Sequence, residues 1–216
     1  DSNSSGPEKV FSLSENQLGN SSVGSYAILE NETFAWFTMG MTGSFTKEQT
    51  KHSRVKFSFD GFDTYYTDIR NFGTVKFVRG KHKMIEKLES LGHDLIAEDM
   101  DNEEFIIRIQ AKSNWPLCKA MMDQTIIAGI GNYIKADALW LARLSPNRLV
   151  GDCTDEELIN LKECVRRVML ESFNSGGKES GKFLIYGKTE DVDGNPVIRE
   201  ETKDGRKTHW CPAVQS

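Results

Sequence analysis

The chain has 216 residues, with 27 Lys and Arg against 32 Asp and Glu and a formal net charge of −5. Its 38% hydrophobic and 27% charged residues are typical of a folded protein with one large domain or two smaller ones. No apolar run approaches the ~20 residues that cross a bilayer, so we expect no membrane association. The acidic balance argues against a broad electrostatic clamp on nucleic acid or lipid.

The four cysteines are scattered along the chain and include no closely spaced pair. This spacing argues against a disulfide framework and against a self-contained zinc ribbon. It indicates a reducing compartment, so we expect an intracellular protein of the nucleus, cytoplasm or nucleoid. The opening DSNSSG has neither the basic start nor the apolar core of a signal peptide, and we expect the chain to begin partway through a larger gene product.

The first region, residues 1–92, contains short aromatic and β-branched runs, several of which alternate between apolar and polar residues. These runs are AILE, TFAWFT, RVKFSFD, DTYYTD and TVKFV. Asp60-Gly61 lies between two of them and is a hairpin signal, while Gly40 and Gly43 mark a tight bend. The pattern predicts part of a β-sandwich, followed by a short helix that ends near Gly92.

The middle region, residues 93–175, changes to the helical period. Its clearest helix is TDEELINLKECVRRVMLESF, where Thr154 and Glu157 form a capping box. Pro116 indicates the start of an earlier helix. The last region, residues 176–216, predicts a β-hairpin around the turn DGNP at 193–196, with a second turn at Asp204-Gly205. The expected fold class is therefore α+β.

The segment MDQTIIAGIGNYIKADAL, residues 122–139, is the most specific in the chain. It predicts a helix end, a turn containing Gly129 and Gly131, and a second helix capped by Asn132. The exposed N–H groups at such a helix start form an anion site, for which a phosphate is the natural ligand. A bare Gly-x-Gly-Asn is more often only the connection of a helix hairpin, because short glycine motifs match freely.

The longer stretch from Lys119 to Pro146 resembles the helix-two-turn-helix element of the formamidopyrimidine-DNA glycosylase and endonuclease VIII family. The resemblance implies that Asn132 and the adjacent backbone amides of Gly129 and Gly131 bind a DNA phosphate next to the lesion. It also implies that Lys119 contacts the DNA backbone.

Two earlier segments, MGMTG at 39–43 and DIRNFG at 68–73, resemble segments of the same family in the expected order. The resemblance implies that Met41, Arg70 and Phe72 form a wedge that fills the base stack when the damaged nucleotide is flipped out. Extruding a base costs a few kcal/mol, and an apolar side chain with a guanidinium can replace the lost stacking. The alternative is that Met41 and Phe72 are core residues.

Basic residues outside the helices extend the resemblance. Arg54 falls where the family has a phosphate-contacting residue, although a solvated strand charge is the alternative. The ending RKTHWCPAVQ resembles the family's finger and implies that Arg206 holds phosphates and assists the final elimination, which makes it the catalytic candidate. A structural zinc needs four ligands, but position 214 is Val and residues 186–200 contain neither Cys nor His. We therefore expect an endonuclease VIII-like member with a zincless finger, no metal and no cofactor.

The family's nucleophile is the amine of an N-terminal Pro-Glu, which forms a Schiff base with the sugar. Pro7-Glu8 is internal, and Ser25 stands where the family has a lysine. We expect the intact product to supply Pro-Glu, and the 216-residue chain to bind damaged DNA weakly without trapping by borohydride.

The leading hypothesis is a base-excision DNA glycosylase with apurinic/apyrimidinic lyase activity, acting as a monomer on double- or single-stranded DNA with oxidised bases or abasic sites. The alternative is a non-catalytic damaged-DNA-binding module that has lost the nucleophile. A ribosomal or RNA-binding protein is disfavoured, because the wedge and finger segments would then be coincidences.

Overall fold

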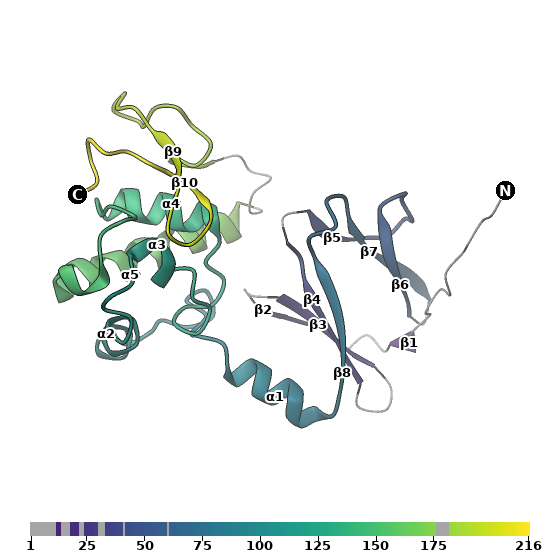
Figure 1. Ribbon diagram of the computed structural model, residues 1–216. Coiled ribbons are helices and arrows are strands. Elements are labelled where there is room, and N and C mark those ends of the chain that lie inside the picture. The colour runs from purple at the N-terminus through teal and green to yellow at the C-terminus, as the bar shows by residue number, and fades with distance from the viewer. Residues whose placement is uncertain are drawn as a thin grey trace. The chain divides into compact units, whose positions relative to one another are not determined.

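The computed structural model describes residues 12–13, 18–21, 24–29, 33–40, 42–59, 61–175 and 182–216. The chain forms two compact units, residues 1–90 and residues 91–216 (Figure 1). No helix in the described ranges is both long and apolar enough to cross a membrane.

The described residues of the first unit form two four-stranded sheets and one helix. One sheet has the order β1-β6-β7-β5 and consists of β1 (Ser12–Leu13), β6 (Ser53–Phe59), β7 (Phe62–Asp68) and β5 (Gly43–Thr46). The other has the order β2-β3-β4-β8 and consists of β2 (Leu18–Ser21), β3 (Gly24–Leu29), β4 (Thr33–Thr38) and β8 (Thr74–Arg79). Helix α1 (Lys81–Glu89) follows β8.

Aromatic side chains from both sheets form the core of this unit. Phe37 of β4 is fully buried, and its ring lies 5.2 Å from that of Phe57 on β6 and 5.8 Å from that of Tyr66 on β7. Such edge-on and tilted pairs add to the burial of apolar area. The two sheets therefore share one apolar layer, as in the predicted β-sandwich. The predicted hairpin is also present, with Gly61 at φ +97° between β6 and β7, whereas Asp60 lies outside the described residues.

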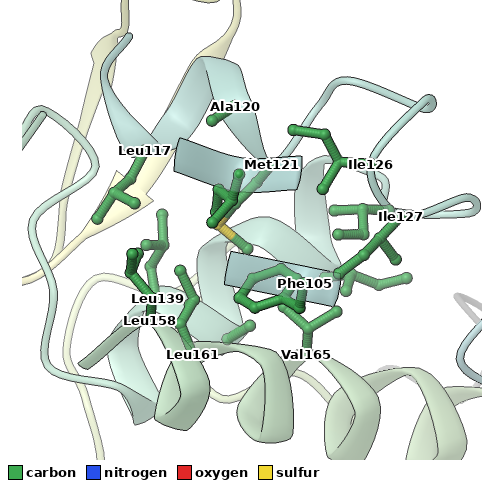
Figure 2. Packing of buried hydrophobic residues seen from close by; sticks show 14 of the residues in the cluster. Phe105, Leu117, Ala120, Met121, Ile126, Ile127, Leu139, Leu158, Leu161 and Val165 are labelled. Carbon is green, nitrogen blue, oxygen red and sulfur yellow. The ribbon is translucent and has the colours of Figure 1, made fainter. Parts of the chain in front are cut away.

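The second unit is mostly helical. Its helices are α2 (Asn102–Gln110), α3 (Leu117–Ala120), α4 (Asn132–Leu141), the 3-10 helix η2 (Val150–Asp152) and α5 (Asp155–Asn174). Thr154 and Glu157 form the predicted capping box of α5. Figure 2 shows how Leu158, Leu161 and Val165 on one face of α5 meet apolar side chains of the other helices, namely Phe105 of α2, Leu117 of α3 and Leu139 of α4. This cluster is the largest apolar core among the described residues.

The predicted C-terminal hairpin is formed by β9 (Ile198–Glu201) and β10 (Lys207–Trp210), but its turn is the second predicted one, at Asp204-Gly205. The turn at 193–196 precedes the hairpin. The reason is local, because the carboxylate of Asp191 accepts hydrogen bonds from the backbone N–H groups of Asp193 and Asn195 and closes that segment as a separate turn. The hairpin belongs to the same compact unit as the helices.

Candidate nucleic-acid interface

The glycine-rich turn before α4 is held by one side chain, that of Gln124. Its Oε1 accepts a hydrogen bond of 2.9 Å from the N–H of Gly129, and its Nε2 donates one of 3.1 Å to the carbonyl of Ile130. Gly129 has φ +89°, a conformation that favours glycine. Gln124 therefore fixes the backbone that leads into the helix. This role is not evident from the sequence, although the glutamine is part of the quoted segment.

The start of α4 differs from the prediction in one detail. Gly131, not Asn132, is the N-cap, and no side chain caps the helix. Asn132 is already the first helical residue, and its Nδ2 donates instead to the carbonyl of Lys207 on β10 at 2.9 Å. The first turn of α4 also contains no acidic residue. The partial positive charge of this helix end is therefore not neutralised by the helix's own side chains.

Space is available directly in front of this helix end. A Cβ atom on Gly131 would meet no heavy atom within 4 Å beyond the two adjacent residues, so packing at this position does not require glycine. The residue instead leaves room for a close approach to the backbone N–H groups of α4. This arrangement suits an anion such as a phosphate.

Lys119 lies on the neighbouring helix α3 and covers an aromatic ring. Its Nζ is 3.8 Å from the ring centroid of Trp115, and the Nζ of Lys112 lies 4.7 Å from the same ring. A cation over an indole face gains about 0.5–2 kcal/mol. Trp115 therefore restricts where the Lys119 ammonium can lie, a role that the sequence analysis did not identify.

Arg206 lies in the turn between β9 and β10, and its side chain is exposed. Its backbone is held on both sides, because its N–H donates to Asp204 Oδ1 at 3.3 Å and its carbonyl accepts from the N–H of Thr202 at 2.9 Å. Asn132 at the start of α4 bonds the next residue, Lys207. Asn132 and the Arg206 turn are thus joined within the second unit.

In the first unit, a buried carboxylate organises the loop that follows β7. Asp68 is 1% exposed, and its oxygens accept hydrogen bonds from Thr42 Oγ1 at 2.5 Å, the N–H of Gly73 at 2.7 Å and the N–H of Arg70 at 3.2 Å. The bonds from Thr42 and Gly73 hold the pKa of Asp68 below its ordinary value. This one side chain ties the 68–73 loop to the 39–43 bend.

The glycines of both segments are needed for this contact. A side chain at Gly73 would collide with the Tyr66 hydroxyl and the Thr38 carbonyl, and one at Gly43 would collide with the Met39 carbonyl. Gly40 has φ +58° and lies against the backbone of Phe72. The two segments quoted from the sequence therefore form one close-packed structure.

The tip of this loop faces outwards. Phe72 is 60% exposed, which excludes the alternative that it is a core residue. The guanidinium carbon of the exposed Arg70 lies 4.8 Å from the centroid of its ring, so the two predicted wedge groups are in contact. Asn71 between them has φ 58°. Met41, the third predicted wedge residue, lies outside the described residues.

The remaining predicted positions are less informative. Arg54 is exposed, and its Nη2 donates to the carbonyl of Asp68 at 3.2 Å, so it also supports the loop. Ser25 pairs with Phe37 in the register between β3 and β4. Pro7 and Glu8 lie outside the described residues.

No cluster of three His, Cys, Asp or Glu side chains in the described ranges could hold a metal ion. In the finger, the buried Gln215 makes the bonds that close the last turn. Its Oε1 accepts from the N–H of Cys211 at 2.7 Å, and its Nε2 donates to the carbonyl of Leu144 at 2.8 Å. The absence of zinc remains a prediction.

The open N-terminus of α4, held by a glycine-rich turn and joined to a hairpin with an exposed arginine, defines a helix-two-turn-helix protein. Residues 91–183 match the family model described as the formamidopyrimidine-DNA glycosylase H2TH domain. The formamidopyrimidine-DNA glycosylase of Prochlorococcus marinus strain MIT 9312 is 31% identical over 212 residues, which cover 86% of this chain and 72% of that protein. A Thermus thermophilus enzyme of the same name is 32% identical over 197 residues, covering 82% and 73%. The chain belongs to the formamidopyrimidine-DNA glycosylase family.

Solved structures agree with this assignment. The crystal structure of the MutM (Fpg) protein from Thermus thermophilus has a TM-score of 0.80 at 30% identity and covers 92% of this chain and 81% of that one. Lactococcus lactis Fpg, non-covalently bound to DNA containing an AP site, has a TM-score of 0.81 at 21% identity, covers 92% and 80%, and shows the same fold. The predicted family and the α+β fold class are therefore confirmed.

Proposed function

We propose that this protein is a base-excision DNA glycosylase that removes oxidised bases from DNA and then cleaves the abasic site as a lyase. The observation that carries this proposal is the exposed pair Arg70 and Phe72 on a loop that the buried Asp68 holds in place. A module that only binds phosphates has no need of such a loop, whereas an enzyme that extrudes a base needs groups to replace it in the stack.

Phosphate binding is the first step of the proposed mechanism. The N–H groups around Gly131 and the amide of Asn132 hold one phosphate at the open end of α4. Lys119, directed by Trp115, and Arg206 hold further phosphates. These contacts fix the register of the duplex without reading its sequence.

Base extrusion is the second step. The Phe72 ring enters the space that the damaged base leaves, and the Arg70 guanidinium stacks beside it. Because the loop is already braced by Asp68 and by Arg54, little ordering is left to occur when DNA binds. Damaged pairs are extruded more readily than intact ones, which adds selectivity.

Chemistry follows through a Schiff base, as the family resemblance implies. A bond forms between an amine nitrogen and the sugar C1′, and the glycosidic bond breaks as the base leaves with a proton. The sugar ring opens to give the imine. When a proton is lost from C2′, its electron pair moves towards the imine nitrogen, and this pair then forms a C2′–C3′ double bond as the 3′ phosphate departs with the electrons of its bond to C3′. Arg206 assists by holding a phosphate during this elimination. The family's amine donor is an N-terminal proline.

The test is base release by the full product of the gene. We expect release of an oxidised base from a duplex and cleavage of the abasic strand, both measured on labelled oligonucleotides. Tight binding to abasic DNA without base release or cleavage would favour the alternative of a non-catalytic damaged-DNA-binding module. Absence of binding would contradict both.

A further inference from the structure

Four polar side chains of α4 each hold a different part of the C-terminal segment. The bonded residues are spread between Leu184 and Lys207, so the four side chains attach this segment to one helix at four points. The bonds run from Asn132 to the Lys207 carbonyl, from Lys135 to Asp204, from the N–H groups of Leu184, Ile185 and Tyr186 to Asp137, and from Trp140 to Asp191. The contact between Lys135 and Asp204 is a buried ion pair.

Lys135 and Asp204 form this ion pair. The Lys135 Nζ lies 2.5 Å from Asp204 Oδ2, and the two side chains are 0% and 3% exposed. Removing one partner of such a pair leaves an uncompensated buried charge, which is strongly destabilising. The Cys118 thiol of α3 also lies beside Asp204, and burial raises the pKa of that thiol, which keeps it neutral. The pair therefore ties the fingertip turn to α4.

The second oxygen of Asp204 faces the turn itself. Asp204 Oδ1 accepts hydrogen bonds from Thr202 Oγ1 at 2.6 Å and from the N–H of Arg206 at 3.3 Å. The Arg206 carbonyl accepts from Thr202 Oγ1 at 3.0 Å and from the Thr202 N–H at 2.9 Å. Gly205, with φ +73°, allows the chain to reverse between them. One carboxylate thus connects Lys135 with the backbone of Arg206, while the Arg206 side chain remains exposed.

We propose that Lys135 and Asp204 are positioning residues for Arg206, and that their buried ion pair holds the fingertip so that the exposed guanidinium is already oriented for a DNA phosphate. This inference rests on the proposed function, because the phosphate is that of the bound DNA. In a zinc finger the metal ties such a hairpin down. Here a charge pair anchored in α4 does so. Lys135 is fully buried, so its effect on DNA binding passes through the turn.

The sign of the charge effect makes the proposal testable. Asp204→Asn removes a negative charge, and simple electrostatics would therefore strengthen DNA binding. The proposal predicts the opposite, a loss of about tenfold in affinity for a duplex with a stable abasic-site analogue. Arg206→Ala should cause a similar loss and a salt slope shallower by about one unit. Adding Asp204→Asn to Arg206→Ala should change little further, because Asp204 acts through Arg206.

Two further variants separate positioning from general effects. Asp193→Asn removes the same charge from the neighbouring exposed turn, and we expect its affinity to equal or slightly exceed that of the wild type. Lys135→Met with Asp204→Asn leaves no unpaired buried charge, so this double variant should fold and still lose about tenfold in affinity. Wild-type affinity in the folded double variant, or additivity with Arg206→Ala, would overturn the proposal.

A measurement without DNA keeps this test separate from that of the proposed function. The amide of Arg206 should exchange its hydrogen faster in Asp204→Asn and in the double variant, whereas amides in the middle of α5 should not change. Unchanged exchange at Arg206 would overturn the positioning role. If the wild type bound no DNA, the proposed function would fail, and the exchange data would still decide whether the ion pair holds the turn.

Discussion

At the scale of single residues, Asn132 has two tasks at one position. Its Nδ2 bonds the Lys207 carbonyl, and it stands in the first turn of α4 beside the open space at Gly131. In the proposed function, the second Nδ2 hydrogen and the helix N–H groups are the donors for a phosphate. The residue joins the finger to the proposed phosphate site.

We expect Asn132→Ala to weaken binding about tenfold for damaged and undamaged duplexes alike, because phosphate contacts position DNA without reading it. Fluorescence anisotropy with matched oligonucleotides measures this. Asn102→Ala is the control, since Asn102 is the first residue of α2 and is exposed, and it should bind like the wild type. A loss confined to one lesion would contradict the role of Asn132.

Asp68 predicts a pH effect on stability. Its pKa lies below the ordinary 3.8 in the folded state because Thr42 and Gly73 donate hydrogen bonds to the carboxylate. A group with a lowered pKa stabilises the fold above its unfolded pKa, and this contribution is lost as the pH falls through the folded pKa. The difference in unfolding free energy between wild type and Asp68→Asn should therefore be largest near neutral pH and shrink below pH 3.8. Denaturant titrations across this range test it, and a pH-independent difference would contradict it.

At the scale of elements, the sequence predicts a helix start or a hairpin correctly where residues close together in the chain determine it. The capping box at Thr154 and Glu157 predicted the start of α5, and the 60–61 turn predicted the β6–β7 hairpin. The signals failed where a distant element competes. Asn132 was predicted as a cap, but β10 offers the Lys207 carbonyl to its side chain. The lysine Lys135 gave no signal, because its partner Asp204 is 69 residues away.

The 68–73 loop carries a prediction about base extrusion. Phe72→Ala should leave the thermal unfolding temperature nearly unchanged, because the ring is 60% exposed, but should reduce extrusion of the target base. A 2-aminopurine placed beside the lesion reports extrusion by its fluorescence. Ile69→Ala is the matched control, because Ile69 is 61% exposed in the same loop. Equal extrusion by both variants would remove Phe72 from the wedge.

The structure of the finger leads to a prediction about the zinc content of the protein. The Gln215 bonds close its last turn, and the Lys135–Asp204 pair anchors its tip. We expect no stoichiometric zinc in the purified protein and no change in unfolding temperature on adding a chelator. One tightly held zinc per chain, found by elemental analysis, would show that the finger is not metal-free.

At the scale of the whole molecule, the net charge of −5 requires that DNA binding depend on a few placed groups. Unit 91–216 carries the groups proposed to bind phosphates, and unit 1–90 carries the Arg70–Phe72 loop. The family and the α+β class followed from motifs in the sequence. Composition alone does not indicate where an acidic chain places cationic groups for DNA. In the structure, Lys119 lies over the ring of Trp115, and Arg206 lies on an anchored turn.

The most direct test of the proposed glycosylase is borohydride trapping with the full product of the gene on a duplex that contains an oxidised base. Reduction converts an imine between the protein amine and the sugar C1′ into a stable covalent bond. The account predicts a protein–DNA adduct that forms on the damaged duplex and is absent from the undamaged one. Turnover of the damaged duplex with no adduct at any borohydride concentration would contradict it.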